Sequence, residues 1–179
     1  DAEARLDLFN TARESLLSDP NREIGTDHYA RPEDSLSQAA ETGALRRNFQ
    51  GYTDDTSEVL IGLGASAISR YPQGFAQNVS ASSRYATAIE NGGLATERGH
   101  QMKGDDALRS QMIEDLMCRF SLDIGALSER FGTKPDALWA MVARMRDRFG
   151  DQISIKGDRL MLKQNARLIA RLCAQEIDA

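Results

Sequence analysis

The feature that most constrains this sequence is a pair of glycines, Gly62 and Gly64, which alternate with apolar residues. Glycine has no side chain to pack and loses much backbone entropy when it is ordered, so this pattern makes a poor ordinary strand. We therefore expect a ligand or another element of the chain to approach the backbone closely here. The alternative is a bulged edge strand with a tight turn.

An apolar ring beside an amide precedes the glycine pair at Phe49 and Gln50. The amide can both donate and accept hydrogen bonds, and the ring offers a flat apolar surface. Together they suit a flat, nitrogen-rich ligand such as adenine. Arg46 and Arg47 come just before them, and either pair with carboxylates of a substrate or are simply solvated.

Three motifs, in this order, resemble the oxygen-independent coproporphyrinogen III oxidases of the radical S-adenosylmethionine class. They are Ile24-Gly25-Thr26-Asp27-His28-Tyr29-Ala30-Arg31-Pro32-Glu33-Asp34, then Arg46-Arg47-Asn48-Phe49-Gln50-Gly51-Tyr52-Thr53, then Gly62-Leu63-Gly64-Ala65-Ser66-Ala67-Ile68-Ser69. Two shorter stretches fit the same family, Phe75-Ala76-Gln77-Asn78 and Leu116-Met117-Cys118-Arg119-Phe120. The match runs from about residue 24 to residue 120 and thins towards the C-terminus.

The resemblance implies a role in haem biosynthesis, the oxidative decarboxylation of coproporphyrinogen III to protoporphyrinogen IX. In such enzymes a 4Fe-4S cluster held by three cysteines cleaves S-adenosylmethionine, and the resulting radical abstracts a hydrogen from a propionate. This chain has only two cysteines, Cys118 and Cys173, and lacks the cluster motif. We therefore expect the cluster ligands to lie upstream of Asp1 in a longer parent, and this part alone to be inactive, with no metal ligand and no catalytic residue.

The resemblance also implies which residues bind the cofactor. Ile68 matches an isoleucine that packs by S-adenosylmethionine, and Phe49 and Gln50 match a pair near a second S-adenosylmethionine. The family commonly shows a Gly-Arg pair before its last helix, where this sequence has Ala166-Arg167. That departure weakens the match of the final segment and leaves the match of the pocket unchanged.

His28 and Arg47 are our candidates for contact with the substrate. His28 follows a short expected strand, where α/β folds commonly place site residues, and histidine can exchange protons near neutral pH. The alternative is that Asp27 and His28 hydrogen-bond the loop before Pro32.

We predict an α+β fold with two domains. Residues 1–103 are expected to form the end of a partial α/β barrel and its extension, because a helix over 1–18 is followed by a short strand over 23–26. Residues 104–179 are expected to form a mainly helical, winged-helix-like domain that covers the active site. Other expected elements are helices over 35–43, 105–120, 124–131, 134–149 and from 164, and one that begins at Ser80 or Ser82 and ends at the Gly92-Gly93 pair. We also expect strands over 59–61 and 74–79, an extended connector over 94–102, and a hairpin over 153–162.

Charge argues against nucleic acid as a partner. The net charge is −5, and residues 104–179 carry twelve basic and twelve acidic residues, so no basic surface is expected. We expect no membrane association, since no apolar run is long enough to cross a bilayer. A monomer in a reducing cytoplasm, with both cysteines buried, fits the remaining features.

Three other interpretations stay open. Haem chaperones of the radical S-adenosylmethionine class are close relatives, although the motifs around His28 and Phe49 look like the oxidase branch. A DNA-binding winged helix would use Arg144, Arg146 and Arg148, but these alternate on a helix and cannot all face one groove. The third is a scaffold or lid domain of an unrelated enzyme.

Overall fold

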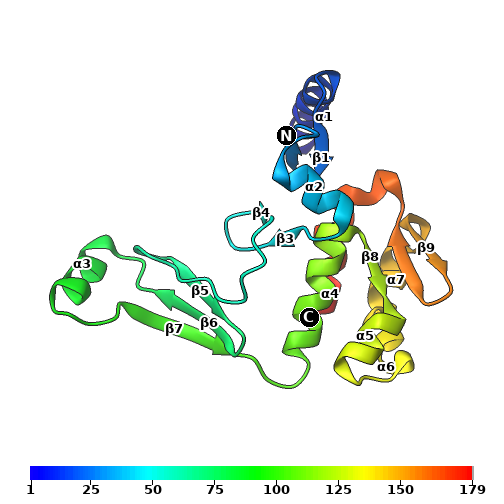
Figure 1. The fold of residues 1–179 in the computed structure, drawn as a ribbon. Coiled ribbons are helices and arrows are strands. Elements are labelled where there is room, and N and C mark those ends of the chain that lie inside the picture. The colour runs from blue at the N-terminus through cyan, green and yellow to red at the C-terminus, as the bar shows by residue number, and fades with distance from the viewer. Residues whose placement is uncertain (179) are drawn as a thin grey trace. The chain divides into compact units, whose positions relative to one another are not determined.

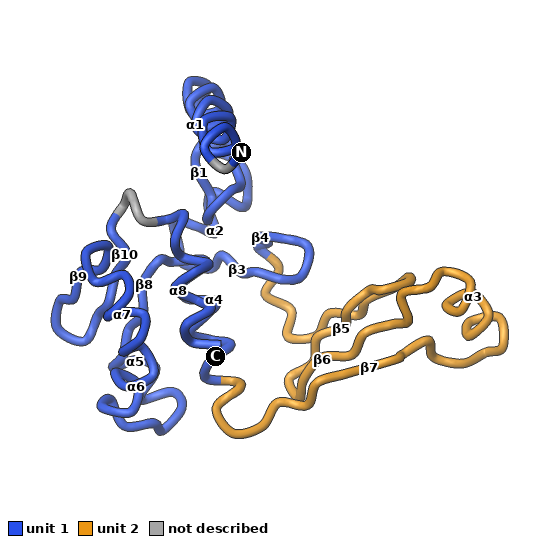
Figure 2. The backbone as a smooth tube through the Cα atoms, turned by 180° about the vertical axis from the view of Figure 1, so that it is seen from behind, with its two compact units in different colours: residues 1–54, 108–179 blue, residues 55–107 orange. Residues whose placement is uncertain are grey.

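The computed structural model describes residues 1–178, without the side chains of residues 2 and 164–166, so the side chain of the Ala166 departure lies outside the described part. The chain forms two compact units, coloured separately in Figure 2. Unit 1 joins residues 1–54 to residues 108–179, and unit 2 is residues 55–107. These units are defined by packing. The domain boundary expected between residues 103 and 104 is a different division of the chain, and it remains a prediction.

The first part of unit 1 is a helix, a hairpin and a second helix (Figure 1). The elements are α1 (Ala2–Ser18), β1 (Arg22–Ile24), β2 (His28–Ala30) and α2 (Ser35–Thr42). β1 and β2 pair antiparallel, so the expected single strand is one arm of a hairpin. The helix over 35–43 is confirmed, since the carboxylate of Asp34 accepts from the Leu36 N–H and Gly43 closes the helix in a left-handed conformation.

A short two-stranded ribbon follows, formed by β3 (Arg46–Arg47) and β4 (Tyr52–Thr53). It contributes Tyr52 to a small core that also holds Ile24, Leu45 and Cys118. None of the residues given for this core comes from the described part of α1. The leucines expected on its inner face are exposed, with 49% of Leu6 accessible.

The second part of unit 1 is a helical bundle with a three-stranded sheet of order β8-β10-β9. Its elements are α4 (Asp106–Arg119), β8 (Ser121–Asp123), α5 (Ile124–Phe131), α6 (Pro135–Met141), α7 (Ala143–Phe149), β9 (Ile153–Lys156), β10 (Arg159–Leu162) and α8 (Ala170–Asp178), with 3-10 turns at Gly150–Gln152 and Gln164–Ile169. The expected apolar stripe of α4 is buried, at Leu108, Met112 and Leu116. Together with the small sheet and helix of unit 2, these elements confirm the α+β class.

Two expectations for this bundle need correction. The single helix expected over 134–149 is two helices, broken at Val142, whose backbone (φ −95°, ψ 4°) is not helical. Leu138, Val142 and Met145 all lie fully buried in one core, as the expected apolar stripe requires. The last helix begins as a 3-10 turn, and Leu172, expected on its inner face, is 38% exposed, whereas Cys173 is fully buried.

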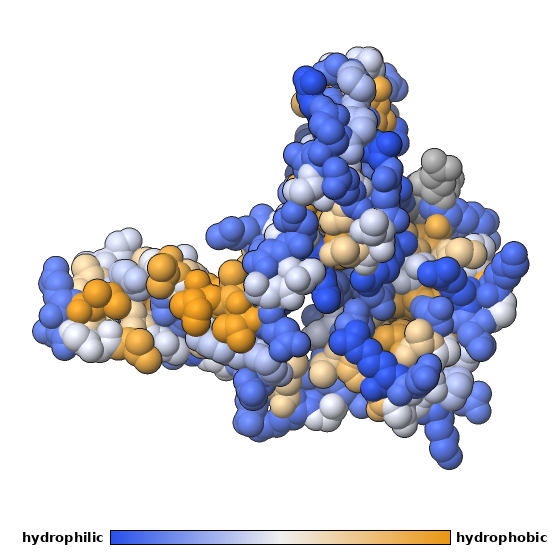
Figure 3. Space-filling model, viewed as in Figure 1, coloured by the Kyte–Doolittle hydropathy of each residue, from blue (hydrophilic) through white to orange (hydrophobic). Residues whose placement is uncertain are grey.

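Unit 2 is a three-stranded antiparallel sheet with one helix. Its elements are β5 (Ile68–Tyr71), β6 (Gly74–Asn78), α3 (Ser82–Glu90) and β7 (Thr96–Gln101), in the strand order β5-β6-β7. The extended connector expected over 94–102 thus becomes a paired edge strand. The buried strand expected over 59–61 is wrong, because Val59 and Ile61 are 44% and 59% exposed and only Leu60 makes an isolated bridge, to Arg70. Figure 3 shows apolar side chains gathered on the surface of unit 2.

Candidate functional site

The candidate site in unit 1 is built around Tyr52, which is 92% buried behind Gly25. Its hydroxyl donates to the carbonyl of Met117 at 2.9 Å and accepts from the Thr26 N–H at 3.2 Å. Burial raises the pKa of the hydroxyl, so it remains a protonated donor. Gly25 has φ +60°, and a Cβ there would lie 2.0 Å from the Tyr52 ring, so only glycine fits.

His28 lies edge-on to the Tyr52 ring, with 5.0 Å between ring centroids. Its Nδ1 is 2.7 Å from Oδ1 of Asp27. A carboxylate only accepts, so Nδ1 donates and, in the neutral ring, Nε2 is left as an acceptor. Nε2 lies against Gly51, where an added Cβ would be 2.9 Å away. Asp27 and His28 therefore bond to one another, which orients the imidazole.

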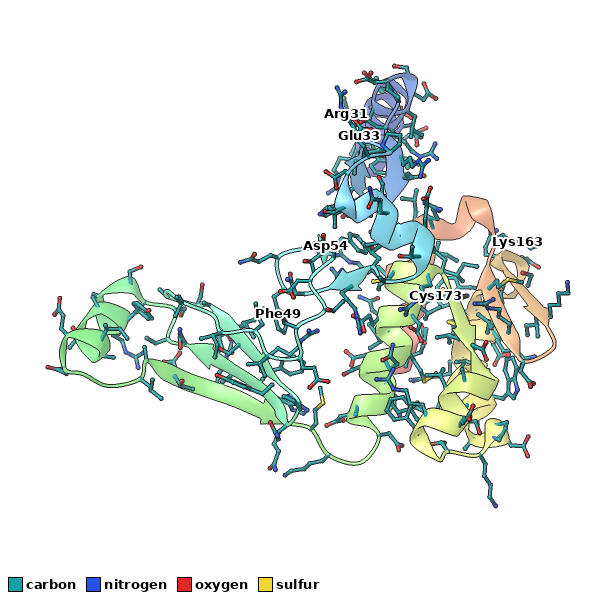
Figure 4. All side chains as sticks on the ribbon, in the orientation of Figure 1. Arg31, Glu33, Phe49, Asp54, Lys163 and Cys173 are labelled. Atoms are coloured by element: carbon teal, nitrogen blue, oxygen red, sulfur yellow. The ribbon has the colours of Figure 1, made fainter. Side chains whose placement is uncertain are left out.

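The loop that carries Phe49 and Gln50 is ordered by Asn48. The Asn48 side-chain oxygen accepts from the N–H groups of Gln50 (2.8 Å) and Gly51 (3.2 Å), and its backbone N–H donates to the Gly51 carbonyl. This Asx turn holds Phe49 at the loop tip, where 55% of it is exposed (Figure 4). The exposed ring and amide fit contact with a flat heteroaromatic group such as the adenine of S-adenosylmethionine.

The two arginines before this loop take different roles. Arg46 forms an ion pair with Glu114 on α4 at 3.0 Å, which is a structural use. Arg47 places its guanidinium 6.0 Å from the centroid of the Tyr52 ring and forms no ion pair with any residue the structure describes. Unit 1 therefore brings His28 and Arg47 together on one aromatic ring.

Ile68, the remaining candidate, lies on β5 of unit 2 and is partly buried. Gly62 packs against it: a Cβ at Gly62 would lie 2.8 Å from the Ile68 backbone, and the Gly62 N–H donates to Ser69 Oγ. The close approach expected at Gly62 is thus confirmed, and the approaching element is β5. Gly64 has open space and φ +110°, so backbone conformation is the reason for glycine there. The partly buried apolar side chain of Ile68 fits the wall of a cofactor pocket.

The cysteines do not fit an iron–sulfur cluster. Cys118 belongs to the small core around Tyr52, whereas Cys173 belongs to the core of the helical bundle. Burial raises the pKa of Cys118 to about 12 and that of Cys173 to about 11. Such thiols stay protonated and are poor ligands. Among residues 1–178, no group of three or more potential ligand side chains that could hold a metal ion occurs, and no helix is long and apolar enough to span a membrane.

Sequence reasoning missed Tyr52 as the residue that organises the site. The only signal was its position beside Gly51 inside the second motif. It also missed Phe120, which has φ +55°, a backbone region that bulky side chains rarely adopt.

Nearly the whole chain is similar in sequence to known proteins. No family model matches the chain. It is 44% identical to the oxygen-independent coproporphyrinogen III oxidase of Paracoccus denitrificans, over 99% of this chain and 40% of that protein. It is 44% identical to the protein of that name from Cereibacter sphaeroides, over 98% of this chain and 39% of the relative. The chain thus spans about two fifths of these relatives.

The fold agrees with the sequence comparison. A solved structure described as the coproporphyrinogen III oxidase HemN from Escherichia coli, a radical SAM enzyme, superposes with a TM-score of 0.92 at 28% identity. The superposition covers all of this chain and 42% of that one. By sequence and by fold, this chain belongs to the oxygen-independent coproporphyrinogen III oxidase family.

Proposed function

We propose that this chain is the pocket-lining and covering part of an oxygen-independent coproporphyrinogen III oxidase, which converts coproporphyrinogen III to protoporphyrinogen IX. The observation that carries the proposal is the identity of 44% over 99% of the chain to a relative of that name. The ordered loop around Phe49 and the glycine-backed strand at Ile68 support it, since both present groups suited to S-adenosylmethionine.

When bound, S-adenosylmethionine supplies the radical chemistry of the reaction. The residues of this chain bind the cofactor and shield the reactive centre from water. Phe49 and Gln50 offer a ring and an amide from a loop that Asn48 holds in place, so little ordering is needed on binding. Ile68 adds an apolar wall that excludes water from a reactive centre. A 4Fe-4S cluster would have to be held by residues other than the two buried cysteines.

Substrate contact is assigned to His28 and Arg47. The guanidinium of Arg47 can pair with a propionate carboxylate, and Nε2 of His28 can accept a hydrogen bond or a proton. Residues 104–179 would cover the site. Their core of seventeen buried residues, which lies between Leu108 and Ile177, supports a stable cover of this kind.

A chimera tests the proposal. The segment of the Paracoccus denitrificans relative that aligns with this chain is replaced by residues 1–179, and protoporphyrinogen formation is measured without oxygen, with S-adenosylmethionine and a reductant. We expect turnover by the chimera and none by the chain alone. A folded chimera with a full cluster spectrum and no turnover would refute the assignment. Haem binding in place of turnover would favour the haem-chaperone interpretation.

A further inference from the structure

A cavity of about 410 Å³ in unit 1 is lined by basic and apolar residues and by no acidic one. Its lining is Arg119, Phe120, Ser121, Arg159, Met161, Leu162, Lys163 and Arg167. Four of the eight residues are cations, although the whole chain carries a net charge of −5. A concentration of positive charge within an acidic protein is a local field that attracts anions. Lys163, one of the lining residues, is labelled in Figure 4.

The positive charge of the cavity is only partly neutralised. Arg119 pairs with Asp115 and donates to the Gly43 carbonyl. Arg167 lies 3.7 Å from Glu23, but Arg13 already binds both oxygens of that carboxylate, at 2.9 and 3.0 Å. One negative charge is therefore shared by two arginines.

Two further cations pair with no carboxylate among the residues that the structure describes. They are Arg159 and Lys163, and the ammonium of Lys163 donates to the carbonyl of Asp151. At least two positive charges therefore remain for a ligand.

Phe120 shapes the floor of this cavity. Its backbone is left-handed (φ +55°), a strained conformation for a bulky residue, and such residues cluster at functional sites. Its N–H donates to Leu116 and its carbonyl accepts from Leu162, so the conformation is fixed from both sides. The guanidinium of Arg167 stacks 4.7 Å from the centroid of the ring. The Phe120 ring therefore carries a guanidinium over one face, and the apolar side chains of Met161 and Leu162 also line the cavity.

A second cavity of about 390 Å³ shares Arg119, Phe120, Ser121, Arg159 and Arg167 with the first and extends to Gly25, behind Tyr52. It also includes Glu23, which pairs with Arg13, and Glu41, which pairs with Arg22. A third cavity, of about 280 Å³, shares Arg119, Ser121 and Arg159 with the first and includes Asp115 and Asp123. The first cavity, a groove without an acidic lining residue, is therefore the better anion site.

We propose that this groove, defined by Arg119, Phe120, Arg159, Lys163 and Arg167, binds propionate carboxylates of the tetrapyrrole substrate. The inference rests on the proposed function and deepens it. Coproporphyrinogen III is a large apolar macrocycle with four propionates, and Arg47 accounts for one carboxylate at most. Guanidinium groups recognise carboxylates through paired hydrogen bonds, and the apolar floor suits the macrocycle. Arg159, which has no carboxylate partner in the described chain, is the residue most available to the ligand.

Coproporphyrin III, the stable oxidised form with the same four carboxylates, is the probe. Its fluorescence anisotropy is followed as the 179-residue chain is added, at low and at moderate salt. We expect Arg159→Gln to weaken binding about tenfold, as for loss of one charge-assisted hydrogen bond, and Arg159→Lys to retain most of it. Arg5→Gln, on the exposed surface of α1, removes the same charge and should change nothing. Mesoporphyrin IX, with two propionates, should bind more weakly than coproporphyrin III.

Three outcomes would overturn the inference. They are no binding of coproporphyrin III, equal binding by wild type and Arg159→Gln, and displacement of the porphyrin by millimolar inorganic phosphate with no preference for four carboxylates over two. The last would indicate a general phosphate site. None of them bears on the chimera, whose turnover tests the proposed function separately. A chimera that turns over, together with an unaffected Arg159→Gln variant, would refute this site and leave the proposed function standing.

Discussion

The hydroxyl of Tyr52 donates a 2.9 Å hydrogen bond to the backbone carbonyl of Met117, which lies 65 residues further along the chain. This bond ties the ribbon that carries Arg47 and the Phe49 loop to helix α4. It also fixes the ring against which His28 packs. The arrangement of the candidate site therefore depends on a contact between two distant segments.

Tyr52→Phe should destabilise unit 1 by about 1–3 kcal/mol, because it leaves the Met117 carbonyl and the Thr26 N–H buried with one partner fewer. Urea unfolding followed by the fluorescence of Trp139, the single tryptophan, reports on this unit. Tyr71→Phe, at a partly exposed position in unit 2, is the control and should leave that transition unchanged. An unchanged transition for Tyr52→Phe would mean that the hydroxyl does not anchor the site.

Gly25→Ala should cost about 2–4 kcal/mol, since it combines left-handed backbone strain with a Cβ placed 2.0 Å from the Tyr52 ring. Gly132→Ala is the matched control. Gly132 has a similar φ of +65° but no atom within 4 Å of an added Cβ, so only the strain of about 1 kcal/mol applies. Equal losses in the two variants, measured by urea unfolding, would contradict the close packing of Gly25 on Tyr52.

The two thiols should resist modification in the folded chain. Cys118 is 7% exposed with its pKa raised to about 12, and Cys173 is fully buried with its pKa raised to about 11. A thiol reagent at pH 8 should react with neither until urea unfolds the chain. Rapid reaction of either thiol in native protein would show that the cores are open.

The same pKa shifts make stability depend on alkaline pH. The folded pKa of Cys118 lies above its ordinary value of 9, so its contribution is complete below pH 9 and is lost as the pH rises towards about 12. The free energy of unfolding should therefore fall over this range. In Cys118→Ala the fall should be shallower, and an identical slope would show that the thiol does not contribute.

Residues 104–179 should not bind duplex DNA despite their winged-helix-like elements. Arg148 pairs with Glu176 at 2.7 Å, Arg144 donates to the Glu176 carbonyl, and Arg146 stacks on Trp139. With twelve basic and twelve acidic residues here, little counterion release is available to drive binding. At low salt we expect a dissociation constant weaker than about 10⁻⁴ M, the upper end of nonspecific binding. Micromolar binding that weakens steeply with added salt would contradict this.

Ile68→Asp, made in the chimera, should abolish S-adenosylmethionine cleavage while leaving the cluster spectrum intact. An unpaired carboxylate in an apolar pocket costs several kcal/mol. Ile61→Asp is the control in the same unit, because Ile61 is already 59% exposed and tolerates a charge. Normal cleavage by a folded Ile68→Asp protein would remove Ile68 from the pocket.

The sequence alone determined the family and those local elements that carry their own capping or turn signals. The helix from Ser35 to Thr42 needed only a capping Asp34 and a terminating Gly43, and the hairpin between β9 and β10 only Gly157 at its turn, because such signals act within a few residues. The three motifs carried the resemblance that the comparisons confirm.

Only the tertiary structure decided how the site is assembled. Gly25, Tyr52 and Met117 meet across long separations in the chain, and the basic groove joins Arg119, Arg159 and Arg167 from three different elements. The tertiary structure also leaves Val59 and Ile61 exposed and divides the expected helix at Val142. Local propensity carries no information about these contacts, because their energies arise only when distant segments bury a common surface.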